Sequence, residues 1–170
     1  EGVIEDISKA IEIGFEDDDS SLSGAYYING QAHYFLNNYK NAIDRFNSAI
    51  KIDPTYNASY YYRGASKYEL NDMYGAISDY DRSLELDSSS TSAYLARAKA
   101  KEKLGKIDDA LIDFNKVVQL EPNNELFIRD RGIFNINHKN LLDAINDFND
   151  AIRINPNNIK IANNKAKLFV

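Results

Sequence analysis

The chain has no cysteine, no tryptophan and only two histidines among its 170 residues. Without cysteine it can form no disulfide framework, thiolate nucleophile or zinc–thiolate site. The histidines, His33 and His138, lie in different halves of the chain, and neither has a second metal ligand at usable spacing. We interpret both as residues that pack between helices or lie at a helix end, and we expect no metal site. The cytoplasm is the favoured compartment, and the periplasm and organelles stay open, because both cytosolic and periplasmic proteins can lack cysteine.

Long apolar runs and an excess of basic residues are also absent. No stretch approaches the roughly 18 consecutive apolar residues that a membrane-spanning helix needs. The formal net charge of -6 and the isoelectric point near 4.9 argue against a general nucleic-acid binder, which is normally basic. We therefore expect no membrane insertion and no nucleic acid as a partner.

The motifs of common enzyme and cofactor sites are missing as well. The sequence has no glycine-rich phosphate loop, no G-x-S-x-G elbow and no H-E-x-x-H motif. An acidic run at 16–19 lacks the alternating ligands and the turn glycine of a calcium-binding loop. We interpret that run as part of a solvated spacer. This segment is predicted to have no catalytic activity and no cofactor.

What the sequence does contain is a repeat of 34 residues. An alanine followed by isoleucine or leucine returns at 34-residue steps, at Ala42, Ala76, Ala110 and Ala144. An aromatic residue follows each alanine at the fourth position, at Phe46, Tyr80, Phe114 and Phe148. A small residue stands at one earlier position of every copy, at Gly30, Gly64, Ala98 and Gly132. Several positions that keep one period over the whole chain indicate a repeat protein.

Each repeat predicts a pair of helices. The second half of the first repeat places its apolar residues on one helical face, at Ala42, Ile43, Phe46, Ala49 and Ile50. Small residues at Gly30 and Ala42 allow the two helices to approach closely, with Phe46 filling the space beside them. A proline such as Pro54 then ends the second helix. In the second repeat the serines at 88–90 replace it and are predicted to turn the chain and cap the next helix.

This pattern of aromatic, Gly/Ala, Ala, Phe/Tyr, Ala and Pro at a 34-residue period resembles the tetratricopeptide-repeat (TPR) family. The resemblance covers 23–158 and implies an all-α, right-handed superhelical solenoid of antiparallel helix pairs. It divides the chain as follows: 1–17, the second helix of a truncated repeat; 18–22, an acidic and serine-containing spacer; 23–56, 57–90, 91–124 and 125–158, four whole repeats; and 159–170, a C-terminal helix of a partial or capping repeat.

The resemblance also implies where a partner would bind. In the TPR family the concave groove of the solenoid is lined chiefly by positions of the first helix of each repeat. Carried onto this sequence, the predicted peptide-binding residues are Tyr27, Gln31, Tyr34, Tyr61, Tyr68, Leu95, Lys99, Lys103, Arg129 and Ile133. The second repeat places Ala65 and Glu69 at further positions of this kind.

The character of these groove positions changes along the chain. The first two repeats present tyrosines, which are rigid amphipathic anchors enriched at binding hot spots. The third and fourth repeats present mostly positive charge. We expect a protein-interaction scaffold whose protein or peptide partner has an apolar or aromatic half and an acidic half. The alternative left open is that the tyrosines pack against the neighbouring repeat and that the lysines are solvated.

One TPR subclass binds the carboxylate tails of chaperones with a Lys, two Asn, a Lys and an Arg on these faces. The matching positions in this sequence hold Tyr27, Gln31, Ala65, Leu95 and Lys99. Four of the five differ from the subclass, so chaperone-tail binding is not the expected function.

A charged pattern recurs within the repeats. Arginine at one position precedes aspartate by sixteen residues in three copies, as Arg63 and Asp79, Arg97 and Asp113, and Arg131 and Asp147. The first repeat has neither member and carries Asn29 and Arg45 instead. Joint presence and joint absence predict that each arginine pairs with the aspartate of its own repeat in a structural, bidentate ion pair.

Two alternative functions remain open from the sequence. The chain could assemble with further copies through apolar residues near its ends, namely Ile4, Ile7, Ile11, Leu168 and Phe169. It could also be the targeting or regulatory domain of a larger enzyme. We expect the natural array to continue beyond both ends of this sequence.

Overall fold

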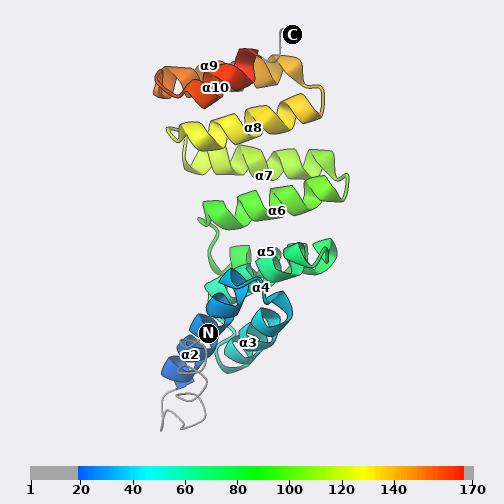
Figure 1. Ribbon diagram of the computed structural model, residues 1–170, viewed down its shortest axis with the longest axis vertical. Coiled ribbons are helices and arrows are strands. Elements are labelled where there is room, and N and C mark those ends of the chain that lie inside the picture. Colours follow the sequence, from blue (N-terminus) through cyan, green and yellow to red (C-terminus); the bar gives the residue numbers. More distant parts are fainter. Residues whose placement is uncertain (1–18, 167–170) are drawn as a thin grey trace. The chain divides into compact units, whose positions relative to one another are not determined.

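The computed structural model describes residues 19–166, and the secondary structure of that part is entirely helical (Figure 1). The helices fall into two compact units, within Glu1–Leu104 and within Gly105–Val170. The first unit contains α2 (Asp19–Phe35), α3 (Tyr39–Ile52), α4 (Asn57–Glu69), α5 (Met73–Leu86) and α6 (Thr91–Lys103). The second contains α7 (Ile107–Leu120), α8 (Glu125–Asn137), α9 (Leu141–Ile154) and α10 (Ile159–Ala166). None of the described helices is both long and apolar enough to cross a membrane.

Helices that follow one another in sequence pack side by side within each unit. In the first unit α2 packs on α3, α3 on α4, α4 on α5 and α5 on α6. Additional contacts join α2 to α4 and α4 to α6, so the first helices of successive repeats are also neighbours. In the second unit α8 contacts α7 and α9, and α9 contacts α10. This is the all-α repeat architecture that the 34-residue period predicts.

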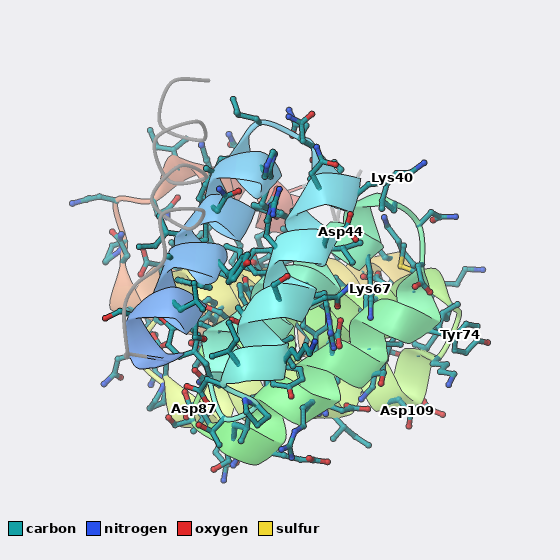
Figure 2. The ribbon with its side chains drawn as sticks, turned by 90° about the horizontal axis from the view of Figure 1, so that it is seen from below. Lys40, Asp44, Lys67, Tyr74, Asp87 and Asp109 are labelled. Carbon is teal, nitrogen blue, oxygen red and sulfur yellow. The ribbon has the colours of Figure 1, made fainter. Side chains whose placement is uncertain are left out.

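Close approach of the two helices of a pair depends on the small residue opposite the aromatic residue that recurs in each repeat. Phe46 is fully buried between α2 and α3. A Cβ atom added to Gly30 would lie 2.6 Å from Phe46 Cε1, which is too close for any side chain. The opposite face of α3 is polar and exposed, as at Lys40 and Asp44 (Figure 2). Helix α3 therefore buries its apolar face against α2 and leaves its polar face in solvent.

The turn between the two helices of each repeat has one conformation throughout. A residue with positive φ follows the first helix in each case, at Asn37, Asn71, Gly105 and Lys139. Around Asn37 the backbone N–H groups of residues 37 and 38 donate to the carbonyls of Tyr34 and His33, which satisfies the last carbonyls of α2. Glycine and asparagine adopt this left-handed conformation at low cost, and Lys139 is the unusual occupant.

The serines that replace proline in the second repeat cap the following helix, as predicted. Ser90 is the N-cap residue of α6, and its side chain accepts a hydrogen bond of 3.3 Å from the Ala93 backbone N–H. Just before it, Asp87 accepts hydrogen bonds from the backbone and hydroxyl of Ser89, so the chain turns without proline.

The predicted spacer at 18–22 is wrong for most of its length. The structure starts α2 at Asp19, so residues 19–22 are helical and extend the first helix of the repeat. Aspartate and serine are common at the start of a helix, because carboxylates and hydroxyls interact favourably with the free N–H groups there. The expected truncated repeat at 1–17 lies outside the described residues. The expected C-terminal helix is present as α10, and residues 167–170 are likewise not described.

Candidate functional site

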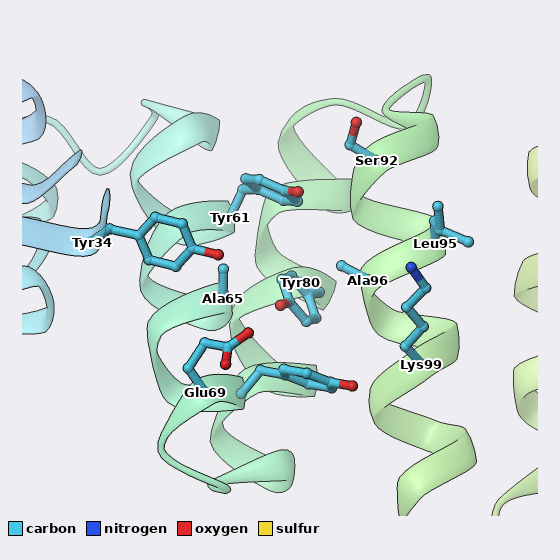
Figure 3. Close-up of a pocket in the computed structure, with 10 residues that line it drawn as sticks. Tyr34, Tyr61, Ala65, Glu69, Tyr80, Ser92, Leu95, Ala96 and Lys99 are labelled. Atoms are coloured by element: carbon cyan, nitrogen blue, oxygen red, sulfur yellow. The ribbon is translucent and has the colours of Figure 1, made fainter. Parts of the chain in front are cut away.

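A cavity of about 360 Å³ lies within the first unit, between helices α2, α4 and α6. These are the first helices of three successive repeats, and α5 contributes the deepest residue, Tyr80. Figure 3 shows Tyr61, Ala65, Tyr80 and Ala96 around the space between the helices, with Tyr34 on the α2 side. The lining consists of Tyr34, Tyr61, Ala65, Tyr68, Glu69, Tyr80, Ser92, Leu95, Ala96 and Lys99. We call it the tyrosine pocket.

Half of the predicted peptide-binding residues line this pocket. They are Tyr34, Tyr61, Tyr68, Leu95 and Lys99. A sixth, Lys103, lies at its edge, because its Nζ sits 3.9 Å from the centroid of the Tyr68 ring. That geometry is a cation–π contact. The predicted residues that line the pocket thus lie on α4 and α6, and Tyr34 lines it from α2.

Tyr80, Ser92 and Ala96 also line the pocket, although the sequence analysis did not place them there. Tyr80 stands in the aromatic slot of a second helix, which we assigned to packing between the helices of a pair. It does pack, since only 2% of its surface is exposed, and its ring lies 5.9 Å from that of Tyr61. The periodicity alone could not show that the Tyr80 ring both packs in the core and lines the pocket.

The phenols of Tyr34, Tyr61 and Tyr80 are protonated hydrogen-bonding groups at neutral pH. Burial raises the pKa of the Tyr34, Tyr61 and Tyr80 hydroxyls above the usual value near 10.0. The negative charge of Glu69 contributes to the rise in pKa at Tyr34 and Tyr80. The pocket therefore offers ring faces, phenolic O–H groups and one carboxylate to a bound side chain.

Tyr27 and Gln31 do not line the pocket. The Tyr27 ring packs 4.9 Å from Tyr56 and 5.9 Å from Tyr62, centroid to centroid, and 6.1 Å from Phe46. Gln31 donates a hydrogen bond of 2.7 Å from Nε2 to the Tyr27 hydroxyl oxygen. For Tyr27 the alternative interpretation therefore fits, because this tyrosine packs against the neighbouring repeat.

The aromatic cluster around Tyr27 predicts a loss of stability at alkaline pH. Burial, followed by the neighbouring Tyr62 and Tyr56, raises the Tyr27 pKa from 10.0 to about 12. The unfolded chain releases this proton near pH 10, and the folded chain releases it only near pH 12. The stabilising contribution is therefore complete below pH 10 and is lost as the pH rises from about 10 through 12.

Urea unfolding followed by circular dichroism at a series of pH values tests this prediction. The Tyr27→Phe variant, which has no proton to release, should lose less stability between pH 9 and pH 12 than the parent. A parallel decline of parent and variant would contradict the assignment of the shift to Tyr27.

Comparison with known proteins identifies the repeat. The family model described as tetratricopeptide repeat matches residues 23–56 and 91–124, which coincide with two of the predicted repeats. These two stretches are tetratricopeptide repeats, and the described residues have the TPR fold. A sequence comparison with curated proteins gives no match.

Solved structures share the TPR fold. The chain resembles MamA at a TM-score of 0.82 and 17% identity, over 94% of this chain and 90% of the other. It resembles YrrB, titled a TPR protein with an unusual peptide-binding site, at 0.76 and 23% identity, over 96% of this chain and 81% of the other. The first TPR of Spaghetti (RPAP3), bound to the HSP90 peptide SRMEEVD, has a TM-score of 0.67 and 25% identity, over 74% and 99% of the two chains.

The two predicted binding residues in the second unit of the TPR array are engaged within that unit. The Arg129 guanidinium pairs with Asp130 at 2.6 Å, so its charge is compensated locally. Ile133 packs against the core cluster of α8, α9 and α10, which includes Ile128 and Phe148. The basic character that the sequence assigns to the later repeats therefore rests, among the described groove positions, chiefly on Lys99 and Lys103 of the first unit.

The recurrent arginines bind the aspartate of their own TPR repeat in two copies. Arg63 donates to both carboxylate oxygens of Asp79, at 2.9 and 2.6 Å, and Lys67 adds an ion pair of 2.8 Å. Arg131 donates to Asp147 at 3.1 and 2.6 Å. Arg97 and Asp113 belong to different units, so that pair stays a prediction.

The arginines also reach the preceding repeat, which the sequence analysis did not expect. Arg63 Nη1 donates to the side-chain oxygen of Asn47 at 2.7 Å, and Arg97 Nη1 pairs with Asp81 at 2.6 Å. In the second unit Arg131 makes the same bond to Asn115 at 2.9 Å. Each of these partners lies sixteen residues behind its arginine, at an exposed position of the preceding repeat, whereas the sequence pattern predicted only the aspartate sixteen residues ahead. Each of these arginines therefore joins consecutive repeats.

Proposed function

We propose that this TPR domain binds an extended or helical segment of a partner protein in the groove of its first unit. The TPR fold is a protein-interaction scaffold, which supports binding as the general function. The tyrosine pocket is the observation that carries the finer proposal. Four tyrosine side chains from three helices surround one cavity there. Tyrosine supplies a large, rigid contact surface at a low entropy cost, so such a pocket suits an anchoring side chain.

The composition of the two walls suggests the chemistry of the bound segment. An apolar or aromatic residue would enter between Tyr61, Ala65 and Ala96. Beyond it, Lys99 on α6 is exposed and Lys103 lies next to it on the same helix. An acidic part of the partner would therefore lie over α6.

Related structures support peptide binding as the mode of action. The RPAP3 domain is titled as bound to an HSP90 peptide, and YrrB as having a peptide-binding site. The chaperone tail itself is not proposed for this chain, because the positions of Tyr27, Gln31, Ala65 and Leu95 do not carry the side chains of the chaperone-binding subclass. We also propose that the segment acts without catalysis.

Selection from a displayed library of random peptides tests the proposed groove. Peptides that bind the parent should lose affinity about tenfold or more when Ala96→Phe fills the pocket. Lys99→Glu combined with Lys103→Glu should weaken peptides with an acidic part by a similar factor. Fluorescence polarisation with the synthetic peptides measures both effects.

Matched variants control for changes in fold and total charge. Ala162→Phe introduces the same side chain at an exposed position of α10, and Lys40→Glu with Lys51→Glu makes the same charge change on α3. These variants should bind as the parent does, and circular dichroism should show all of them folded. If Ala96→Phe leaves the affinity of the selected peptides unchanged, or if the library yields no common motif, the groove is not the binding surface.

Assembly through the chain ends remains the alternative function. The residues that suggested it, Ile4, Ile7, Ile11, Leu168 and Phe169, lie outside the described residues. Light scattering over a range of protein concentrations distinguishes the two, because groove binding needs no increase in mass.

A further inference from the structure

The tyrosine pocket carries a negative charge on the side away from Lys99. Glu69 is the last residue of α4, is exposed, and lines the pocket. Figure 3 shows its carboxylate turned toward the space between Tyr34 and Tyr80. The C-terminal end of a helix is itself a region of negative potential, so the position already disfavours an uncompensated carboxylate.

Among the described residues, the cations of the first unit leave this carboxylate without an ion pair. Lys67, two residues earlier on α4, pairs with Asp79 at 2.8 Å. Lys103 places its ammonium over the Tyr68 ring. Lys99 lines the same pocket from α6, and within the described residues no ion pair joins it to Glu69. A bound cation could therefore meet Glu69 without displacing a partner of the carboxylate.

The rings beside Glu69 add to the attraction for a cation. An aromatic face attracts an ammonium or guanidinium group through its quadrupole, and the attraction grows when water is excluded. Tyr34 and Tyr80 are the phenols on which the Glu69 charge acts. The contact between Lys103 and Tyr68 shows that a ring of this pocket accommodates an ammonium group. The formal net charge of -6 would in addition draw basic segments toward the protein.

We infer that the segment bound in the groove carries a lysine or arginine that meets Glu69 and the ring of Tyr34. The inference rests on the proposed groove function. It adds a basic part to the partner segment and gives the order of the three parts along that segment. From α2 to α6 the groove presents Glu69 with Tyr34, then Tyr61 with Ala65 and Tyr80, then Lys99. The matching partner segment is basic, then apolar, then acidic. Opposite charges at its two ends also set the direction in which it lies.

Peptides from the selection described above provide the probes. Those that lose affinity on Ala96→Phe are synthesised with each basic residue replaced in turn by norleucine, which keeps the aliphatic stem. One such replacement should weaken binding about three- to tenfold, as expected for a partly exposed ion pair with a ring contact. Glu69→Gln should weaken the unmodified peptide by a similar factor. The norleucine peptide should bind parent and Glu69→Gln alike, because the interaction is then absent from both.

A charge reversal gives the sharper result. Glu69→Lys should bind a peptide with aspartate at the basic position better than it binds the original peptide. Glu85→Gln serves as the control, because this carboxylate lies on α5 outside the pocket and pairs with Arg82. It should leave every affinity unchanged.

The outcomes separate this inference from the groove proposal. If peptides are sensitive to Ala96→Phe but lack a basic residue, or if Glu69→Gln and Glu69→Lys leave their binding unchanged, the inference is wrong and the groove stands. If no selected peptide is sensitive to Ala96→Phe, both proposals are wrong.

Discussion

Replacing Phe46 with alanine should lower the free energy of unfolding of the first unit by about 3–5 kcal/mol. Phe46 is fully buried, and its ring stacks 6.0 Å from Tyr62 and lies 6.1 Å from Tyr27, between centroids. Gly30 faces the ring and has no side chain that could move into the vacated space. The cost therefore includes the lost transfer of the ring from water and a cavity that the surroundings cannot fill.

A second phenylalanine of the same unit provides the control for Phe46. Phe35 is 68% exposed at the end of α2, so Phe35→Ala should change the stability by less than about 0.5 kcal/mol. Urea unfolding followed by circular dichroism compares the two variants with the parent. Equal effects of the two substitutions would mean that the buried ring does not hold α2 against α3.

Replacing Asp79 with alanine should cost about 3 kcal/mol of stability. Asp79 is 3% exposed, and its carboxylate accepts hydrogen bonds from Arg63 while pairing with Lys67. Without it, two positive groups that are themselves mostly covered lose their counter-charge. Such uncompensated charges destabilise more than the intact ion pair stabilises.

The interpretation of Asp79 requires two comparisons. Asp44→Ala, at an exposed aspartate of α3, should be close to neutral. The double variant Arg63→Met with Asp79→Leu should recover part of the loss, because it removes two of the three charges and leaves only Lys67 without its counter-charge. A double variant that is no better than Asp79→Ala would show that the loss comes from packing and not from charge.

The repeat and its helix pairs could be predicted from sequence because they depend on local chemistry. Helical spacing alone puts Ala42, Phe46 and Ala49 on one face, whatever the rest of the fold. That face is buried because it is apolar. Capping by Ser90 is equally local, since its hydroxyl bonds to an N–H three residues away. The spacer prediction at 18–22 failed for a local reason too. The same acidic and serine residues that mark a solvated loop also favour the first turn of a helix.

The groove was predictable only as a set of positions. Tyr27 and Tyr34 are separated by two helical turns, so the sequence assigned them one role. In the structure Tyr62 contacts both rings, but Tyr27 is also covered by Tyr56 and does not line the pocket, whereas Tyr34 lines it beside Tyr61. Which rings of a tyrosine-rich face pack together depends on how closely neighbouring repeats approach, and that is a property of the packed molecule.

The sequence by itself thus determined the helices, their pairing and the likeness to the TPR fold, because a period of 34 residues repeats the same local interactions. It also determined which arginine meets which aspartate in two repeats, since a spacing of sixteen residues spans one helix pair. Only the tertiary structure decided that Tyr80 lines a pocket and that Glu69 faces Tyr34 with no ion pair to another described residue. Those features arise where three helices from different repeats converge, and no local pattern records the distance between side chains so far apart in the chain.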